Sequence, residues 1–248
     1  NLAGHSFPLW IDQKGGQEVL QTTVTALEQT APTRDGSVFY IHQLSELERQ
    51  LLVEQNCMSR DLAQSTQPSA LWVQPQQGLA VMINEEDHLR LQVFCGGFHL
   101  KRLWKLASVL DTALEERLSF AFSGQLGYLT ACPTNVGTGM RASVLMHLPG
   151  LYLMGHIEKV IRAVNQLGIA VRGVFGEGSE ASGSMFQISN QQTLGATEAT
   201  ILKRLSGVVE SLVEQENAAR KKYLQQESSK LFDKIGRSFG VVRYGQSL

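Results

Sequence analysis

Hydrophobic and polar residues follow two periods along the chain, and these periods predict strands and amphipathic helices. From His99 to Leu118, apolar residues recur every three or four positions, as on a helix with one buried stripe. In residues 79–84, leucine, valine and isoleucine alternate with Ala80 and Met82, which predicts a strand covered on both faces. Other strands are expected at 70–74, 88–94, 128–130, 142–148, 169–175 and 185–189, and other helices at 18–29, 156–167 and from 197 to about 222.

The order of these elements predicts the fold class. Ser45 and Glu48 have the spacing of a capping box and mark another helix start. Strands that follow one another through short turns, with helices interspersed, indicate an α+β fold with a large, mostly antiparallel β-sheet flanked by helices. The chain contains no internal repeat or low-complexity linker, so residues 1–248 are expected to form a single domain. The polar, glycine-containing segment after Phe232 is expected to be the edge of something longer.

Composition excludes several classes of partner. The 248 residues carry a formal net charge of −1, so no global attraction to nucleic acid or to anionic membranes is expected. No apolar run reaches the ~20 residues of a membrane span, and no signal-peptide pattern is present. Three singly spaced cysteines fit neither a disulfide framework nor a zinc ribbon, which favours a reducing cytoplasm. Metal-ligand spacing such as HxxxH is also missing, so no metal site is predicted.

An acidic segment, Asn84-Glu85-Glu86-Asp87-His88-Leu89-Arg90, joins two of the expected strands. Such a charge cluster is often only a solvated turn. At the tip of a hairpin, however, carboxylates beside an arginine are also suited to a binding site. A guanidinium group is bound best by planar, bidentate carboxylates, so this segment is a candidate guanidinium site. His88 is the one histidine inside a candidate site.

A second segment, Cys132-Pro133-Thr134-Asn135-Val136-Gly137-Thr138-Gly139-Met140-Arg141, combines a thiol, a glycine-rich loop and an arginine. It matches neither the Walker A nor the GxGxxG pattern. The glycines could form only a turn, or they could let backbone amides reach a phosphate. Cys132 could be a buried apolar residue, but cationic neighbours would favour its thiolate. Cys57 and Cys95 lack such neighbours and are expected in the core.

A third segment, residues 171–180, places Arg172 at a strand end and Glu177 in a glycine-rich loop. Loops of this composition are often plain connectors. A long glycine-rich loop that carries charge is also typical of a lid over a substrate.

Taken together and in this order, the three segments resemble the catalytic domain of the guanidino kinases (phosphagen kinases and bacterial protein-arginine kinases). The resemblance covers nearly the whole chain, and residues 176–181 and 190–195 are most similar to the protein-arginine kinases. It implies the antiparallel sheet flanked by helices of that family (glutamine synthetase-like). It also implies transfer of the γ-phosphoryl group of ATP, with Mg²⁺, to the guanidinium of arginine in protein substrates. Free arginine or another small guanidino compound is the alternative acceptor.

The same resemblance implies roles for single residues. Glu86 and Glu177 would bind the target guanidinium, and Cys132 would contact it from the other side. Arg90, Arg141 and Arg172 would bind the phosphates of ATP. The remaining nucleotide-site residues would be backbone segments, namely Ala142, Ser143, Val144 and Leu145, and Gly173, Val174, Phe175 and Gly176. Implied partners are proteins with exposed arginines, an activator protein and a Clp protease that degrades the marked proteins in a bacterial stress response.

The chain also departs from the family pattern. Relatives carry a Ser-x-Arg-x-Arg motif just before the Asn-Leu-Ala with which this sequence begins, and protein-arginine kinases carry a further helical domain after the catalytic one. We therefore expect a catalytic domain without that arginine motif and without the C-terminal helical domain. A non-catalytic module that binds nucleotide or arginine is thus a further alternative. Leu145 occupies a position where phosphagen kinases have a histidine, which favours the protein-directed branch.

Overall fold

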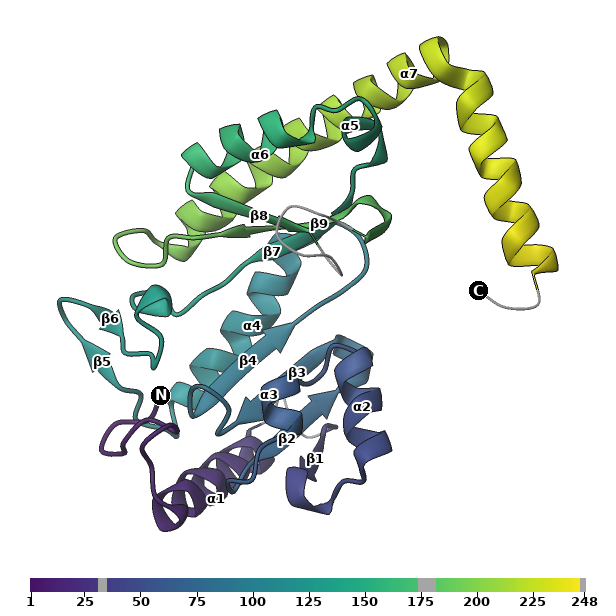
Figure 1. The fold of residues 1–248 in the computed structure, drawn as a ribbon. Coiled ribbons are helices and arrows are strands. Elements are labelled where there is room, and N and C mark those ends of the chain that lie inside the picture. Colours follow the sequence, from purple (N-terminus) through teal and green to yellow (C-terminus); the bar gives the residue numbers. More distant parts are fainter. Residues whose placement is uncertain (31–34, 174–181, 246–248) are drawn as a thin grey trace. The chain divides into compact units, whose positions relative to one another are not determined.

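The computed structural model describes residues 1–30, 35–173 and 182–245, and it divides into two compact units. Unit 1 contains residues 1–140 and 193–198, and unit 2 contains residues 141–192 and 199–248. The strands described form antiparallel sheets of four, two and three strands, and helices lie against them (Figure 1). The prediction of an α+β fold with antiparallel strands is confirmed.

The sheet of unit 1 has the strand order β1-β2-β3-β4 and runs antiparallel throughout. Its strands are β1 (Ser37–Tyr40), β2 (Ala70–Gln74), β3 (Leu79–Ile83) and β4 (Leu89–Val93). All five residues of β3 are buried, as the sequence predicted. Leu79, Val81 and Ile83 belong to one apolar cluster, whereas Ala80 and Met82 belong to another. The sheet therefore has a core on each face.

Helices form those two cores. On one face pack α1 (Gln13–Gln29) and α4 (Leu100–Glu115), and on the other pack residues of α2 (Glu46–Glu54) and α3 (Arg60–Ala63). The capping box expected at Ser45 and Glu48 is present. The first helix starts earlier than predicted, because Asp12 accepts a hydrogen bond from the Gly15 amide and caps it. A small hairpin of β5 (Phe122–Ser123) and β6 (Gly127–Tyr128) completes the unit.

Unit 2 is a three-stranded sheet covered by helices on one face. The strands are β7 (Ser143–His147), β8 (Ile169–Gly173) and β9 (Met185–Asn190), in the order β7-β9-β8. The helices are α5 (Pro149–Leu153), α6 (Ile157–Gln166) and α7 (Glu198–Tyr244). Figure 1 shows α6 and the first part of α7 side by side along this sheet. Their apolar stripes are buried, and so are Phe186 and Ile188 of β9.

A buried carboxylate holds α5 against α7. Glu216 on α7 is 4% exposed and accepts hydrogen bonds from the amides of Gly150 (2.8 Å) and Leu151 (2.9 Å). Arg220 forms an ion pair with Glu216 and donates to the carbonyl of His147 at 3.1 Å. The carboxylate thus satisfies two amides at the start of α5 that have no partner within that helix.

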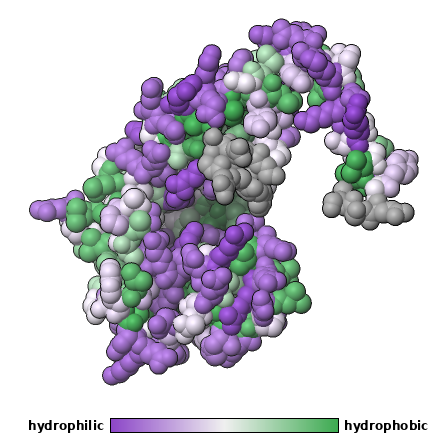
Figure 2. Space-filling model, in the orientation of Figure 1, coloured by the Kyte–Doolittle hydropathy of each residue, from purple (hydrophilic) through white to green (hydrophobic). Residues whose placement is uncertain are grey.

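The helix α7 is much longer than the sequence predicted, since it continues to Tyr244. It bends sharply at Glu227, whose backbone dihedrals (φ −132°, ψ 29°) are not helical (Figure 1). After the bend, Phe232, Ile235 and Phe239 are more than half exposed, and hydrophobic surface is visible there in Figure 2. The sequence prediction ended this helix too early, because the segment contains serines and the glycines Gly236 and Gly240, which are weak helix formers. No helix of the described residues is long and apolar enough to span a bilayer.

Candidate active site

The acidic segment forms the turn of the β3–β4 hairpin, as predicted. Asn84 adopts a left-handed backbone conformation (φ 56°), and its amide donates to the carbonyl of His88 at 3.0 Å. Its side-chain nitrogen donates to the carbonyls of Gly16 (2.8 Å) and Pro68 (2.7 Å). Asparagine tolerates this backbone conformation better than most residues, so Asn84 both makes the turn and anchors it to the unit.

Glu85 and Arg90 are bound to each other across this turn. The Arg90 guanidinium donates to the Glu85 carboxylate at 3.0 Å, and the Glu85 side chain is only 3% exposed. Burial opposes ionisation of Glu85, but hydrogen bonds from Ser59, the Glu86 amide and Arg90 outweigh it and lower the pKa of this carboxyl. Glu85 is therefore an ionised group that orients Arg90. The Arg90 side chain remains 52% exposed.

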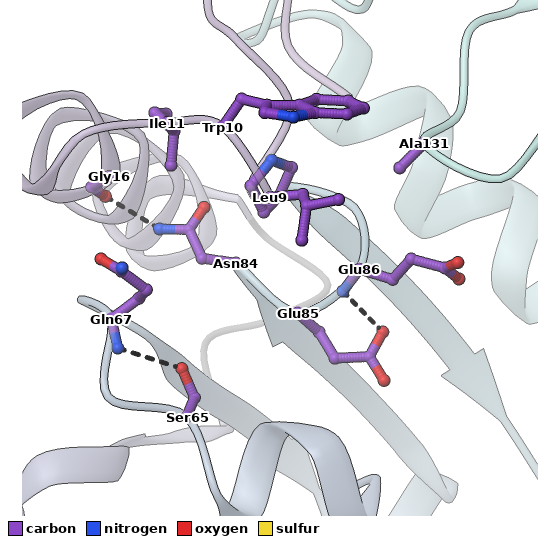
Figure 3. Close-up of a pocket in the computed structure, with 11 residues that line it drawn as sticks. Leu9, Trp10, Ile11, Gly16, Ser65, Gln67, Asn84, Glu85, Glu86 and Ala131 are labelled. Carbon is purple, nitrogen blue, oxygen red and sulfur yellow. Dashed lines mark hydrogen bonds between the residues drawn. The ribbon is translucent and has the colours of Figure 1, made fainter.

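Glu86 differs from Glu85 in its exposure and in the direction in which its pKa is shifted. Glu86 is exposed to solvent, whereas the Glu85 side chain is buried. Partial desolvation and the charges of Asp87 and Glu85 raise the pKa of the Glu86 carboxyl above its ordinary value. Figure 3 shows its carboxylate extending away from Asn84, on the side of Ala131. An accessible carboxylate with a raised pKa is suited to binding a cation and accepting a proton.

Asp87 connects the hairpin to the loop that carries the candidate cysteine. Its carboxylate accepts a hydrogen bond from the Ala131 amide at 2.7 Å and another from the Asn1 side chain. Because Ala131 directly precedes Cys132, this contact brings the Cys132 segment to the hairpin turn. The structure thus places the Cys132 segment near Glu86, although the two are far apart in the sequence.

Cys132 itself lies in a bend after β6 and directly before a short 3-10 turn (Pro133–Asn135). Its sulfur is 3.0 Å from the Thr134 hydroxyl, and the residue is partly exposed. It is therefore accessible, as a contact residue must be. Cys57 is partly buried, but the expectation of a core position is wrong for Cys95, which is exposed. Cys95 lies two residues beyond the end of β4, outside the sheet.

His88 has a structural position. It is fully buried, its Nδ1 accepts from the Leu2 amide at 3.0 Å, and its Nε2 lies 2.9 Å from the Ser6 carbonyl. Burial lowers the pKa of His88 to about 4. The ring is thus a neutral connector between the start of the chain and the hairpin turn.

The backbone amides of the Gly-Thr-Gly loop are already used within the chain. Gly137 donates to the Tyr128 carbonyl (3.2 Å), Thr138 to the Thr193 carbonyl (3.1 Å) and Gly139 to the Asn135 carbonyl (3.1 Å). The prediction that these amides reach a phosphate is therefore not supported by this structure. The glycine at 137 serves packing instead, because it has a φ of +111° and a Cβ there would lie 2.4 Å from the Thr193 carbonyl.

In unit 2, three of the residues predicted to line the nucleotide site, Ser143, Leu145 and Arg172, lie on one face of the sheet. The register pairs Arg172 with Gln187 and Leu145 with Gln187, so these three side chains share a face with Ser143 and Ser189. That face is exposed at Ser143, Leu145 and Arg172, whereas Phe186 and Ile188 are buried.

Arg141 is held against the same sheet. Its guanidinium donates to the Ser189 hydroxyl at 3.3 Å. The next amide, that of Ala142, donates to the Asn190 side chain at 2.7 Å and is not available to a nucleotide. Among the described strands, β7 pairs only with β9, so its other edge is open for backbone contacts from Ser143 to Leu145.

Four of the predicted residues, Val174, Phe175, Gly176 and Glu177, lie outside the described residues.

Sequence analysis missed Ser59, which hydrogen-bonds Glu85, and Thr193, whose hydroxyl is 2.8 Å from the carbonyls of both Thr134 and Val136. A serine before a short helix signals a cap, but nothing in the sequence links it to Glu85. Within the described residues, no group of three or more histidine, cysteine or acidic side chains could hold a metal ion.

Comparison with known proteins agrees with this chemistry. Residues 18–219 match the family model of the ATP:guanido phosphotransferase C-terminal catalytic domain. The chain belongs to this family, whose members are phosphotransferases with a guanidino acceptor.

Curated relatives within this family have a more specific name. The chain is 41% identical to the protein-arginine kinase of Brevibacillus brevis, with 100% of this chain and 70% of that protein aligned. It is 42% identical to the protein-arginine kinase of Halothermothrix orenii, over 100% of this chain and 71% of that protein.

Solved structures show the same fold. A lombricine kinase superposes with a TM-score of 0.80 at 24% identity, over 90% of this chain and 65% of that one. The duplicated taurocyamine kinase of Schistosoma mansoni, solved with transition-state analogue components, gives a TM-score of 0.77 at 28% identity. That match covers 87% of this chain and 31% of the other.

Proposed function

We propose that this chain transfers the γ-phosphoryl group of ATP to arginine side chains of protein substrates. The observation that carries the proposal is identity of about 40% along the whole chain to proteins named protein-arginine kinase. The accessible Glu86 carboxylate, at a turn fixed by neighbouring hydrogen bonds, supports it.

Glu86 would bind the target guanidinium and accept a proton from it. A guanidinium is always protonated near neutral pH and is a poor nucleophile, so a nitrogen must lose a proton as it attacks. A new N–P bond then forms to the γ-phosphorus, the bond to the β–γ bridging oxygen breaks, and ADP leaves. Glu177 is proposed as the second carboxylate at the guanidinium. Cys132 would position the guanidinium and would form no covalent intermediate.

Arginine side chains would supply the positive charge that phosphoryl transfer requires. Arg90, Arg141 and Arg172 are proposed to bind the phosphates of ATP, since they are the cations that the resemblance assigns to this task. Transfer depends mainly on positioning and on charge stabilisation at the γ-phosphoryl oxygens. Mg²⁺ that enters with the nucleotide would add positive charge to that stabilisation. Backbone of 142–145 and 173–176 would line the rest of the nucleotide site, through groups other than the Ala142 amide.

The cellular context is a further part of the proposal. We place the activity in the cytoplasm of a bacterium, where the phosphorylated proteins would pass to a Clp protease during stress. An activator protein is a proposed partner. Three cysteines without a disulfide among the described residues are compatible with a reducing compartment.

The proposal is tested by incubating the chain with ATP, Mg²⁺ and an arginine-rich protein. Acid-labile phosphate should appear on arginine by mass spectrometry and should be lost in Glu86→Ala. Phosphate on another amine would contradict the assignment. Binding of ADP-Mg²⁺ by calorimetry without any turnover would instead favour a binding module.

A small guanidino acceptor is the rival substrate, and the likeness to a taurocyamine kinase structure keeps it open. Equal concentrations of free arginine, taurocyamine and an arginine peptide should be compared. The proposal expects the highest kcat/KM for the peptide. A preference for a free compound would move the chain to the metabolite branch of the family.

A further inference from the structure

Beside Glu86, unit 1 contains a cavity that the transfer of phosphate does not require. Its volume is about 330 Å³, and its walls include Leu9, Trp10, Ile11, Asn84, Glu86 and Ala131 (Figure 3). This volume lies at the lower end of the range for ligand pockets, about 300–1,000 Å³.

The apolar wall of this cavity is unusually exposed. Leu9 is 78% exposed and Trp10 is 69% exposed, although both are large and hydrophobic. Covering them with an apolar group would be favourable, since burial of apolar surface contributes roughly 25 cal/mol per Å². Tryptophan offers a large, rigid contact surface of the kind that dominates binding interfaces.

A polar atom in the wall also lacks a partner. Asn84 is 4% exposed, and its side-chain oxygen accepts no hydrogen bond from any described residue. Figure 3 shows the nitrogen of the same amide directed at Gly16, with the oxygen turned away from that bond. The oxygen atom is itself buried, so it makes the wall polar at this point but offers an occupant no accessible acceptor.

We propose that this cavity receives an apolar side chain of the protein acceptor, two positions from the target arginine in an extended segment. This inference rests on the proposed function. Residues two apart in an extended strand point to the same side, so one can fill the cavity while the arginine reaches Glu86. Glu86 lines the cavity and is also the proposed guanidinium ligand, so the two sites are continuous.

The charges favour an apolar occupant over a second basic side chain. Glu85 lines the cavity, but its carboxylate is already paired with Arg90 at 3.0 Å. Glu86 is committed to the target guanidinium. A second cation would therefore find no unpaired carboxylate among the lining residues described, whereas an apolar side chain would contact Leu9, Trp10 and Ile11.

The test compares two peptides that contain one arginine each. One carries leucine two positions before and after the arginine, and the other carries serine there. Trp10→Ala and Leu9→Ser should each lower kcat/KM for the leucine peptide by about tenfold, because burial of one leucine side chain contributes a free energy of that size. For the serine peptide, kcat/KM should change by less than about twofold. Leu47→Ser is the matched control, since Leu47 is 76% exposed on α2 and does not line the cavity.

Two results would overturn the inference. One is equal kcat/KM for both peptides in the unmodified chain, and the other is an equal loss for both peptides in Trp10→Ala. Both peptides can also be labelled with a fluorophore, and their binding without ATP can be measured by fluorescence anisotropy. This measurement separates the inference from the proposed function. Selective, Trp10-dependent binding without phosphate transfer would leave the cavity assignment standing and remove the kinase proposal. Phosphate transfer without selectivity would do the reverse.

Discussion

The hairpin turn of unit 1 and the sheet face of unit 2 hold their charged side chains differently. At the turn, the carboxylates of Glu85 and Asp87 both accept hydrogen bonds. Of these three acidic residues, only Glu86 is exposed. On the sheet face, Arg172 is exposed on a strand whose opposite face is buried. The position of Glu86 is thus set by the hydrogen bonds of its neighbours Glu85 and Asp87, whereas the direction of the Arg172 side chain is set by the register of its strand.

This difference has a physical reason. The role proposed for Glu86 requires a carboxylate within hydrogen-bond distance of its ligand and at a defined angle, and the hydrogen bonds of Asn84 and Asp87 fix the backbone on either side of it. Arginines that bind phosphate have long side chains and several donors, so a sheet face suffices to point them in one direction. The expectations below follow from this contrast.

The largest effect is expected for Glu86→Gln. Loss of the carboxylate should lower kcat for the arginine peptide by about 10³-fold, since general acid–base catalysis contributes roughly 10²–10⁴-fold. The free energy of unfolding should change by less than about 0.5 kcal/mol, because the residue is exposed. Kinetics and urea unfolding of the same preparation test this, with the exposed Glu54→Gln as control. A large loss of stability would contradict a purely functional role.

Glu216→Ala is expected to lower the stability of the fold, although Glu216 has no proposed role in catalysis. Removing this buried carboxylate leaves the Gly150 and Leu151 amides and Arg220 without their partner, which should cost about 3 kcal/mol of unfolding free energy. Glu214→Ala, an exposed neighbour on the same helix, should have little effect. Similar unfolding midpoints for both variants would refute the structural role of Glu216.

Arg172→Lys should separate charge from geometry on the sheet face. Lysine keeps the charge but loses the planar fork, so kcat should fall by about 10²-fold with ATP, close to the loss of one transition-state donor. Stability should be unchanged, since Arg172 is exposed. Arg162→Lys on α6 is the control. Full activity of Arg172→Lys would show that a positive charge alone is sufficient there.

The smallest effect concerns pH and His88. Its folded pKa of about 4 is below the ordinary 6.5, so the unfolded chain binds a proton more readily in that interval. The free energy of unfolding should therefore fall by about 2.6 kcal/mol as the pH drops from 6.5 to 4. In His88→Gln this part of the pH dependence should vanish, whereas the exposed His42→Gln should retain it. Parallel pH curves for all three proteins would exclude His88 as the cause.

Much of the fold followed from periodicity. The strands at 70–74, 79–83 and 89–93 match the prediction closely because their residues are apolar and bounded by turn formers. The helices α3 and α5 were missed because little more than one helical turn shows no helical period, and the four-residue strand β1 was missed as well. The segment after Glu227 was missed for a different reason. Helical backbone hydrogen bonds can form there without a buried stripe.

What the sequence determined by itself was chemistry and order along the chain. The acidic turn, the Cys132 segment and the arginines could be recognised because each group of residues is local. The tertiary structure alone decided how these groups are used. It paired Glu85 with Arg90, joined Asp87 to the Cys132 segment and consumed the amides of the Gly-Thr-Gly loop. Those outcomes depend on contacts between residues far apart in sequence, and no local pattern encodes which donor meets which acceptor.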